Sequence, residues 1–165
     1  EAARGAPTET IALHTPMGPT QGVALVDQPV LVPILRSGLG MLDAALEALP
    51  DSETGFIGLK RDEATLRPEV YMNTIPQLDE RAVVLLDPML ATGGSANYAA
   101  AQARDRGAGE VTLVVLLAAP EGIEVVRAAG AVDRVVTASI DSHLNEIGFI
   151  VPGLGDAGDR QYGVD

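Results

Sequence analysis

The sequence predicts an α/β fold with a doubly wound, mostly parallel sheet, and two observations support this prediction. Short, nearly continuous apolar runs of strand length recur along the chain, as expected for strands that are covered on both faces. Segments with apolar residues at helical spacing lie between these runs, and such an alternation is typical of a doubly wound sheet. The 165 residues, 47% of them apolar, predict a single domain with one core.

The first predicted strand and helix follow one another directly. The apolar run 30–35 predicts a buried strand, and apolar residues at helical spacing over 39–49, closed by Pro50, predict a helix. Residues 1–29 are rich in Pro, Gly and Thr and predict an N-terminal arm, in which only 10–13 has the pattern of an edge strand. The α/β core is expected to cover residues 30–140.

The middle of the core predicts three strands and a polar excursion. Segments 56–59 and 70–75 have strand patterns, and the charged stretch 60–68 between them predicts a mobile loop. The run 82–86 predicts a second buried strand, which ends abruptly at Asp87.

The second half of the core continues the alternation. Ala96, Ala99, Ala100 and Ala103 recur on one helical face, and Gly107 stands where a C-terminal cap belongs. The remaining predicted elements are a strand over 111–118, a helix over 121–129 and a strand over 134–140. Residues 141–165, rich in glycine, predict an irregular tail.

Composition excludes several classes of function. Eleven basic against 23 acidic side chains give a net charge of −12, the wrong sign for a nucleic acid backbone or an anionic membrane. Two Phe, three Tyr and no Trp offer no platform for stacking bases, and the absence of Cys excludes disulfides and thiol chemistry. We expect a cytoplasmic protein that binds neither nucleic acid nor membranes.

The clearest candidate site follows the second buried strand. Ligands of open parallel sheets bind at the carboxyl ends of the strands, where this chain reads Asp-Pro-Met-Leu-Ala-Thr-Gly-Gly-Ser over 87–95. Glycine amides, the hydroxyls of Thr92 and Ser95 and a helix N-terminus are suited to a phosphate. A tight turn would explain the glycines alone, but Asp87 at the strand end favours a ligand site. The loop has no Walker lysine and no dinucleotide fingerprint.

This run resembles the ribose-5-phosphate loop of the phosphoribosyltransferases, in the form found in the uracil phosphoribosyltransferase family. Other branches usually carry two adjacent acids where this chain has Asp87 and Pro88. The segment 33–40 is similar to the family's pyrophosphate-binding turn, with Ser37 in place of the usual Ala. The resemblance implies the phosphoribosyltransferase fold with a C-terminal hood and a flexible β-hairpin loop.

The flexible loop and the hood correspond to two further segments. The run 58–62 resembles the start of the loop that closes over the substrate, and Arg61 matches an arginine that contacts pyrophosphate. A solvated surface charge is the alternative for Arg61, and a weaker alternative for Arg36. Residues 145–160 resemble the uracil-binding hood, although Phe149 stands where relatives commonly have Tyr.

The resemblance implies transfer of a phosphoribosyl group from 5-phospho-α-D-ribose 1-diphosphate (PRPP) to uracil, giving UMP and diphosphate. It assigns catalytic roles to Asp87, Asp156 and Arg61. It assigns PRPP binding to Arg36, Ser37, Gly38, Arg61, Asp87, Pro88, Met89, Leu90, Ala91, Thr92, Gly93, Gly94, Ser95 and Asp156. It assigns uracil binding to Ile150, Gly155, Asp156 and Ala157. Mg²⁺ is expected to bind through PRPP and water, with Asp87 and Asp156 nearby and no direct protein ligand.

The resemblance also implies a homodimer or larger homo-oligomer, GTP as a candidate effector, and a helical segment before the position of Glu1. Three alternatives stay open from the sequence. The first is a phosphoribosyltransferase specific for another base. The second is a nucleotide-sensing regulator on the same fold, and the third is an inactive fragment.

Overall fold

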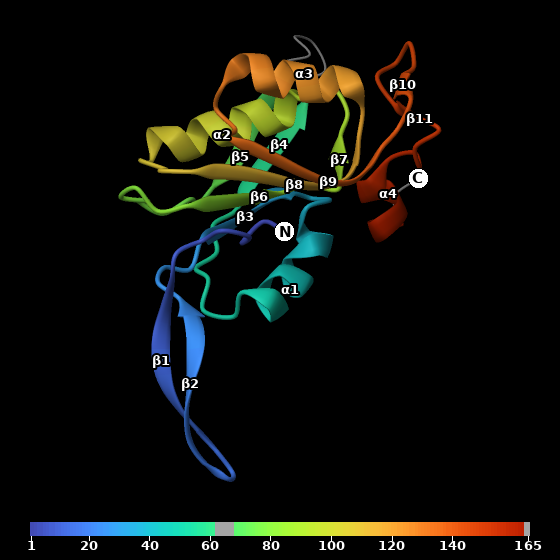
Figure 1. Cartoon of the computed structure of the whole chain (residues 1–165). Coiled ribbons are helices and arrows are strands. Elements are labelled where there is room, and N and C mark those ends of the chain that lie inside the picture. Colours follow the sequence, from blue (N-terminus) through green and yellow to red (C-terminus); the bar gives the residue numbers. More distant parts are fainter. Residues whose placement is uncertain (62–67, 164–165) are drawn as a thin grey trace.

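A seven-stranded, mostly parallel sheet forms the centre of the protein (Figure 1). The computed structural model describes residues 1–61 and 68–163. The strand order is β5-β4-β3-β6-β8, with β7 and β9 both paired to β8. The strands are β3 (Val30–Leu35), β4 (Ile57–Arg61), β5 (Pro68–Asn73), β6 (Val83–Leu86), β7 (Met89–Leu90), β8 (Val111–Ala118) and β9 (Arg134–Ile140). β5 runs antiparallel to β4, and the other pairs are parallel.

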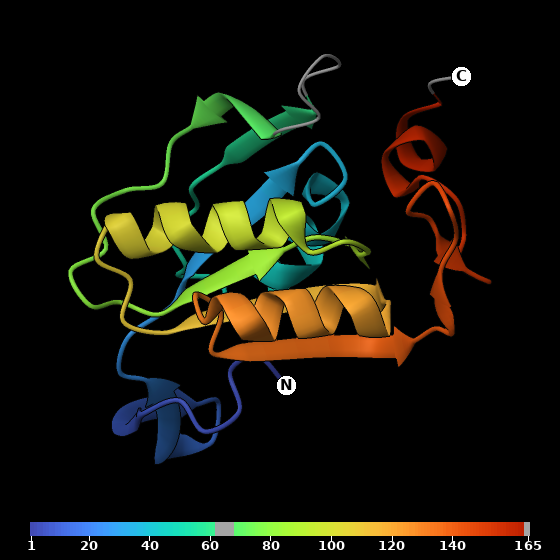
Figure 2. The same cartoon turned by 90° about the horizontal axis from the view of Figure 1, so that it is seen from above.

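Helices cover both faces of this sheet, as predicted for a doubly wound fold. In Figures 1 and 2, α2 (Gly94–Asp105) and α3 (Pro120–Ala129) lie on one face, and α1 (Leu39–Ala48) lies on the other. The carboxyl ends of β3 and β6 therefore point to the same edge of the sheet, because the two strands are parallel and adjacent.

The side chains of β3 explain why its apolar run is nearly continuous. Val30, Val32 and Ile34 belong to the buried cluster that includes α2, whereas Leu31 belongs to a second cluster with Leu42 of α1. Successive strand residues point to opposite faces, so a strand covered on both faces has no polar positions. Each fully buried side chain of this size contributes about 1.5–3 kcal/mol to stability.

Helix α2 follows its predicted pattern closely. Ala96, Ala99, Ala100 and Ala103 are all buried, and their small side chains let the helix lie close to the sheet. Gly107 has a φ of 85°, the left-handed conformation expected just after a helix end.

The N-terminal arm is more regular than its sequence predicts. It is an antiparallel hairpin of β1 (Thr8–Thr15) and β2 (Gly18–Leu25) that projects from the body of the molecule (Figure 1). The predicted edge strand over 10–13 was therefore too short. Nearly every residue of β1 is exposed, so it lacks the apolar alternation by which a strand is recognised in a sequence.

The prediction of an irregular C-terminal tail is wrong in part. Residues 141–163 include β10 (His143–Leu144), β11 (Ile150–Val151) and helix α4 (Ala157–Tyr162). These elements are too short to show a periodicity in the sequence. The predicted flexible loop begins at the end of β4, and its residues 62–67, Asp62 among them, lie outside the described residues.

None of the helices in the described parts of the chain has the length and apolar character needed to cross a membrane.

Candidate functional site

The turn after β3 and the end of β6 are packed directly against each other. A Cβ atom built on Gly38 would lie 2.2 Å from the carbonyl oxygen of Leu86, so only glycine fits at this position. The neighbouring Ser37 hydroxyl donates a hydrogen bond to Oδ1 of Asp87, with a donor–acceptor distance of 3.4 Å. Two segments separated by 50 residues thus meet at one edge of the sheet.

Asp87 occupies an environment that disfavours its charge. Desolvation by burial is the main cause that raises the pKa of its carboxyl from 3.8 to about 7, and the negative charge of Asp156 contributes to this rise. Hydrogen bonds from the Met89 amide, at 3.3 Å, and from Ser37 oppose this rise. A carboxyl with a pKa near 7 exchanges its proton at neutral pH, which is typical of functional sites.

The N-terminus of α2 is open toward solvent. Gly93 precedes the helix with a φ of 80°, no side chain caps the helix, and its first turn contains no acidic residue. Thr92, Gly94 and Ser95 are exposed. Amides of an uncapped first turn lack helical acceptors, and together with the helix dipole they favour an anion.

Helix α3 packs against the loop after β6. A Cβ atom on Gly122 would lie 2.2 Å from the carbonyl oxygen of Ala91, so the loop and the first turn of α3 are in direct backbone contact. The side chain of Glu121, one residue earlier, accepts a hydrogen bond from the Leu144 amide at 2.9 Å. That hydrogen bond lowers the pKa of Glu121. The first turn of α3 therefore contacts both the loop and Leu144, the residue that directly precedes the hood.

A cavity of about 390 Å³ lies between the strand ends and the hood. Its walls are Ser37, Met89, Ala91, Ile147, Gly148, Phe149, Ile150, Gly155, Asp156, Ala157 and Gly158. The structure thus brings together predicted residues from three separate motifs: the turn after β3, the loop after β6 and the hood.

Other predicted residues lie around this cavity without forming its wall. The carbonyl oxygen of Pro88 accepts hydrogen bonds from Leu116 and Leu117, and that of Leu90 accepts one from Ala119, so both positions support the loop from inside. The remaining predicted residues outside the wall are Arg36, Gly38, Asp87, Thr92, Gly93, Gly94 and Ser95. Arg61 is the last residue of β4, and its side chain lies outside the described part of the structure.

Four wall residues were not among the predicted site residues. Ile147, Gly148 and Phe149 lie at the tip of the hood, and Gly158 belongs to α4. Ile147 and Phe149 are 74% and 41% exposed, so they give the mouth of the cavity an apolar rim. The signal for all four was their position inside the glycine-rich run 145–160, which predicted the hood as a whole.

The carboxylates at this site suit a hard cation such as Mg²⁺ that is also bound by substrate or water. Within residues 1–61 and 68–163, no group of three or more acidic, His or Cys side chains could by itself hold a metal ion. Asp156 lies close enough to Asp87 for its negative charge to raise the pKa of Asp87. Carboxylate oxygens are ligands that Mg²⁺ prefers, commonly through retained water molecules.

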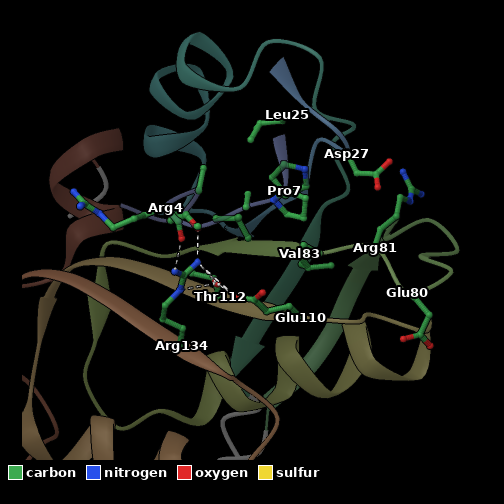
Figure 3. A pocket seen from close by; sticks show the side chains of 17 residues that line it. Arg4, Pro7, Leu25, Asp27, Glu80, Arg81, Val83, Glu110, Thr112 and Arg134 are labelled. Carbon is green, nitrogen blue, oxygen red and sulfur yellow. Dashed lines mark hydrogen bonds and ion pairs between the residues drawn. The ribbon is translucent and has the colours of Figure 1, made fainter. Parts of the chain in front are cut away.

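A second cavity, of about 300 Å³, lies at the opposite end of the sheet (Figure 3). Arg134 donates hydrogen bonds to the carbonyl oxygens of Ala2 and Arg4 and forms an ion pair with Glu110. Arg4 is paired with Glu1. These contacts fasten the start of the arm to the sheet, which gives the cavity a structural explanation.

The comparisons with known proteins agree over nearly the whole chain. A family model described as uracil phosphoribosyltransferase matches residues 1–164. Uracil phosphoribosyltransferase from Streptomyces griseus is 54% identical over 99% of this chain and 79% of that protein. The enzyme of the same name from Corynebacterium diphtheriae is 49% identical over 99% of this chain and 78% of that protein.

Solved structures show the same likeness. The AQ2163 protein from Aquifex aeolicus has a TM-score of 0.90 and 38% identity, over 99% of this chain and 79% of that one. Hypoxanthine phosphoribosyltransferase from Trypanosoma cruzi has a TM-score of 0.56 and 19% identity, over 73% of this chain and 64% of that one. The second likeness concerns the fold alone.

Proposed function

Because the chain belongs to the uracil phosphoribosyltransferase family, a family of glycosyltransferases, we propose that it transfers the phosphoribosyl group of PRPP to N1 of uracil, releasing diphosphate. One observation carries this proposal: a single cavity joins the turn after β3, the loop after β6 and the hood. A substrate with a phosphate, a sugar, a diphosphate and a base needs such a joint site.

The 5′-phosphate is assigned to the N-terminus of α2. The uncapped amides of the first turn and the exposed hydroxyls of Thr92 and Ser95 are donors for its oxygens. Asp87, at the end of β6, accepts hydrogen bonds from the ribose hydroxyls in its ionised form. Binding energy from the phosphate, which does not react, orients the anomeric carbon between base and diphosphate.

The diphosphate is assigned to the turn after β3 and to the loop after β4, through Arg36, the 37–38 amides and Arg61. Cleavage at the anomeric carbon passes through a state with oxocarbenium character, so charge grows on the departing oxygens. One guanidinium group can donate hydrogen bonds to two such oxygens at once, which stabilises the growing negative charge. When bound, Mg²⁺ adds positive charge beside the diphosphate, held through PRPP and water near Asp87 and Asp156.

The base is assigned to the hood. Uracil presents alternating carbonyl acceptors and N–H donors, and the backbone around Ile150, Gly155 and Ala157 lines the cavity where its edge would lie. A base with a different pattern leaves buried polar groups unpaired, which costs about 1–3 kcal/mol for each group.

The remaining family features are also proposals here. We propose a cytoplasmic homodimer or larger homo-oligomer, with GTP as a candidate effector. Leu13, Met17 and Val23 of the hairpin are 42%, 95% and 70% exposed, and exposed apolar side chains on a projecting element support self-association. Sedimentation of the purified protein tests the first proposal, and rates measured with added GTP test the second.

The decisive assay measures diphosphate release from PRPP with uracil and Mg²⁺. Orotate and hypoxanthine, offered in parallel, test the base. We expect diphosphate release with uracil and none with orotate or hypoxanthine. Release with another base would replace the proposed substrate, and nucleotide binding without release would favour a nucleotide-sensing regulator instead.

A further inference from the structure

Helix α4 connects the two ends of the candidate cavity. Its first residues, Ala157 and Gly158, belong to the hood and line the cavity, and Gly158 lies against Ser37 of the turn after β3. Two further residues of the same helix, Asp159 and Tyr162, contact Arg36, the residue before Ser37. A helix of six residues thus contacts both the base end and the diphosphate end of the site.

Two contacts join α4 to Arg36. Oδ1 of Asp159 lies 3.4 Å from Nη2 of the Arg36 guanidinium, and the Tyr162 hydroxyl donates to the Arg36 carbonyl oxygen at 3.3 Å. The backbone of Asp159 is itself fixed, because its amide donates to Oδ1 of Asp156 at 2.9 Å. The carboxylate of Asp159 is therefore presented to Arg36 from a defined position.

The ion pair between Asp159 and Arg36 is weak, so a diphosphate can displace Asp159 from the guanidinium. The Asp159 and Arg36 side chains are 48% and 55% exposed, and a single long contact joins them. Solvent weakens such pairs strongly. A diphosphate offers several charged oxygens to one guanidinium, and a paired contact of this kind is stronger than the single contact to Asp159.

We propose that Asp159 is a positioning residue that holds the Arg36 guanidinium between turnovers and competes with diphosphate for it. This inference rests on the proposed function, because it takes Arg36 as part of the diphosphate site. While the site is empty, the guanidinium is neutralised and kept at the cavity edge. When diphosphate leaves, Asp159 takes the guanidinium back, so the product is bound less tightly than it would be without this carboxylate.

The first test measures diphosphate affinity by calorimetry in the presence of Mg²⁺. Asp159→Asn removes the charge and keeps the backbone amide that caps α4. We expect the dissociation constant of diphosphate to fall about two- to fivefold, the range that an exposed ion pair supplies. Asp159→Glu, which keeps the charge, should stay near the wild-type value. Glu146→Gln removes an exposed carboxylate from the hood and serves as the matched control for net charge.

The second test asks whether the effect passes through Arg36. In an Arg36→Ala background, Asp159→Asn should leave diphosphate affinity unchanged, whereas a general loosening of α4 would change it in both backgrounds. The uracil KM should not move in the Asp159→Asn single variant, because the wall of the base cavity is intact.

The outcomes separate this inference from the proposed function. Equal or weaker diphosphate binding by Asp159→Asn, in a protein that releases diphosphate from PRPP and uracil, overturns the competition and leaves the function standing. A wild-type protein that neither binds nor releases diphosphate overturns both. Tighter binding that persists without Arg36 also overturns the inference.

Discussion

The buried carboxyl of Asp87 predicts an unusual dependence of stability on pH. Its pKa is raised from 3.8 to about 7, so the folded protein binds a proton more tightly than the unfolded chain does. Between these two values, raising the pH ionises the unfolded chain first, and the free energy of unfolding falls. Most structural carboxylates have lowered pKa values and produce the opposite slope.

The size of this effect follows from the two pKa values. At 1.36 kcal/mol for each pH unit, the difference between 3.8 and about 7 destabilises the fold by about 4 kcal/mol once Asp87 is fully ionised. About half of this, roughly 2 kcal/mol, falls between about pH 5.5 and about pH 8.5. Asp87→Asn removes the titrating group, while its amide oxygen can still accept hydrogen bonds from Met89 and Ser37.

The assay compares urea unfolding of the wild type and Asp87→Asn, without Mg²⁺ or substrates, at several pH values across that range. The variant should be the more stable protein, and its advantage should grow by about 2 kcal/mol and then level off above about pH 7.5. With a urea slope of about 2 kcal/mol per molar, the gap between the midpoints widens by about 1 M.

Two comparisons make the result decisive. Glu146→Gln removes a carboxylate that is exposed to solvent, so its stability should run parallel to that of the wild type. A difference between Asp87→Asn and wild type that stays constant with pH, or that narrows as the pH rises, would refute the argument that desolvation controls this carboxyl.

Further predictions concern activity, binding and packing. Asp87→Asn should keep the fold, but its turnover, measured as diphosphate release, should fall at least about tenfold, because an amide cannot supply the negative charge assigned to this position. Unchanged turnover would show that Asp87 does not have the proposed role. PRPP binding should tighten as the pH rises and level off above about pH 8, roughly one unit above the pKa of Asp87, because the ionised form of Asp87 is needed. Calorimetry in Mg²⁺ at several pH values checks this, and a flat profile counts against it. Arg61→Ala should raise the KM for PRPP while leaving that for uracil nearly unchanged, and an unaltered PRPP response would contradict its assignment to the diphosphate. Gly122→Ala should destabilise the protein by about 1–3 kcal/mol, because its Cβ would meet the Ala91 backbone at 2.2 Å. Gly40→Ala is the matched control for thermal unfolding. It should cost far less, because the three atoms nearest to the added Cβ all belong to the flexible side chain of Gln161.

The central elements of the fold were predictable because burial on both faces leaves a local mark. The runs 30–35 and 111–118 match β3 and β8 residue for residue, and the alanine spacing of α2 reports a face pressed against the sheet. The resemblance of the 87–95 run and of the hood to one family was equally a property of consecutive residues. Such signals survive in a sequence because each residue's environment depends on neighbours a few positions away.

What the tertiary structure alone decided depends on residues far apart in the chain. The sequence cannot show that Asp159 meets Arg36 across 123 residues, that Leu86 leaves no room for a side chain at position 38, or that burial moves the pKa of Asp87 to about 7. The exposed hairpin was underestimated for a related reason, since its strands are held by pairing with each other and by almost no burial. Composition and periodicity record how much of each residue is covered. Only the tertiary structure determines which group covers a residue and at what distance. The electrostatic interactions and hydrogen bonds of the site depend on these contacts between residues far apart in the chain.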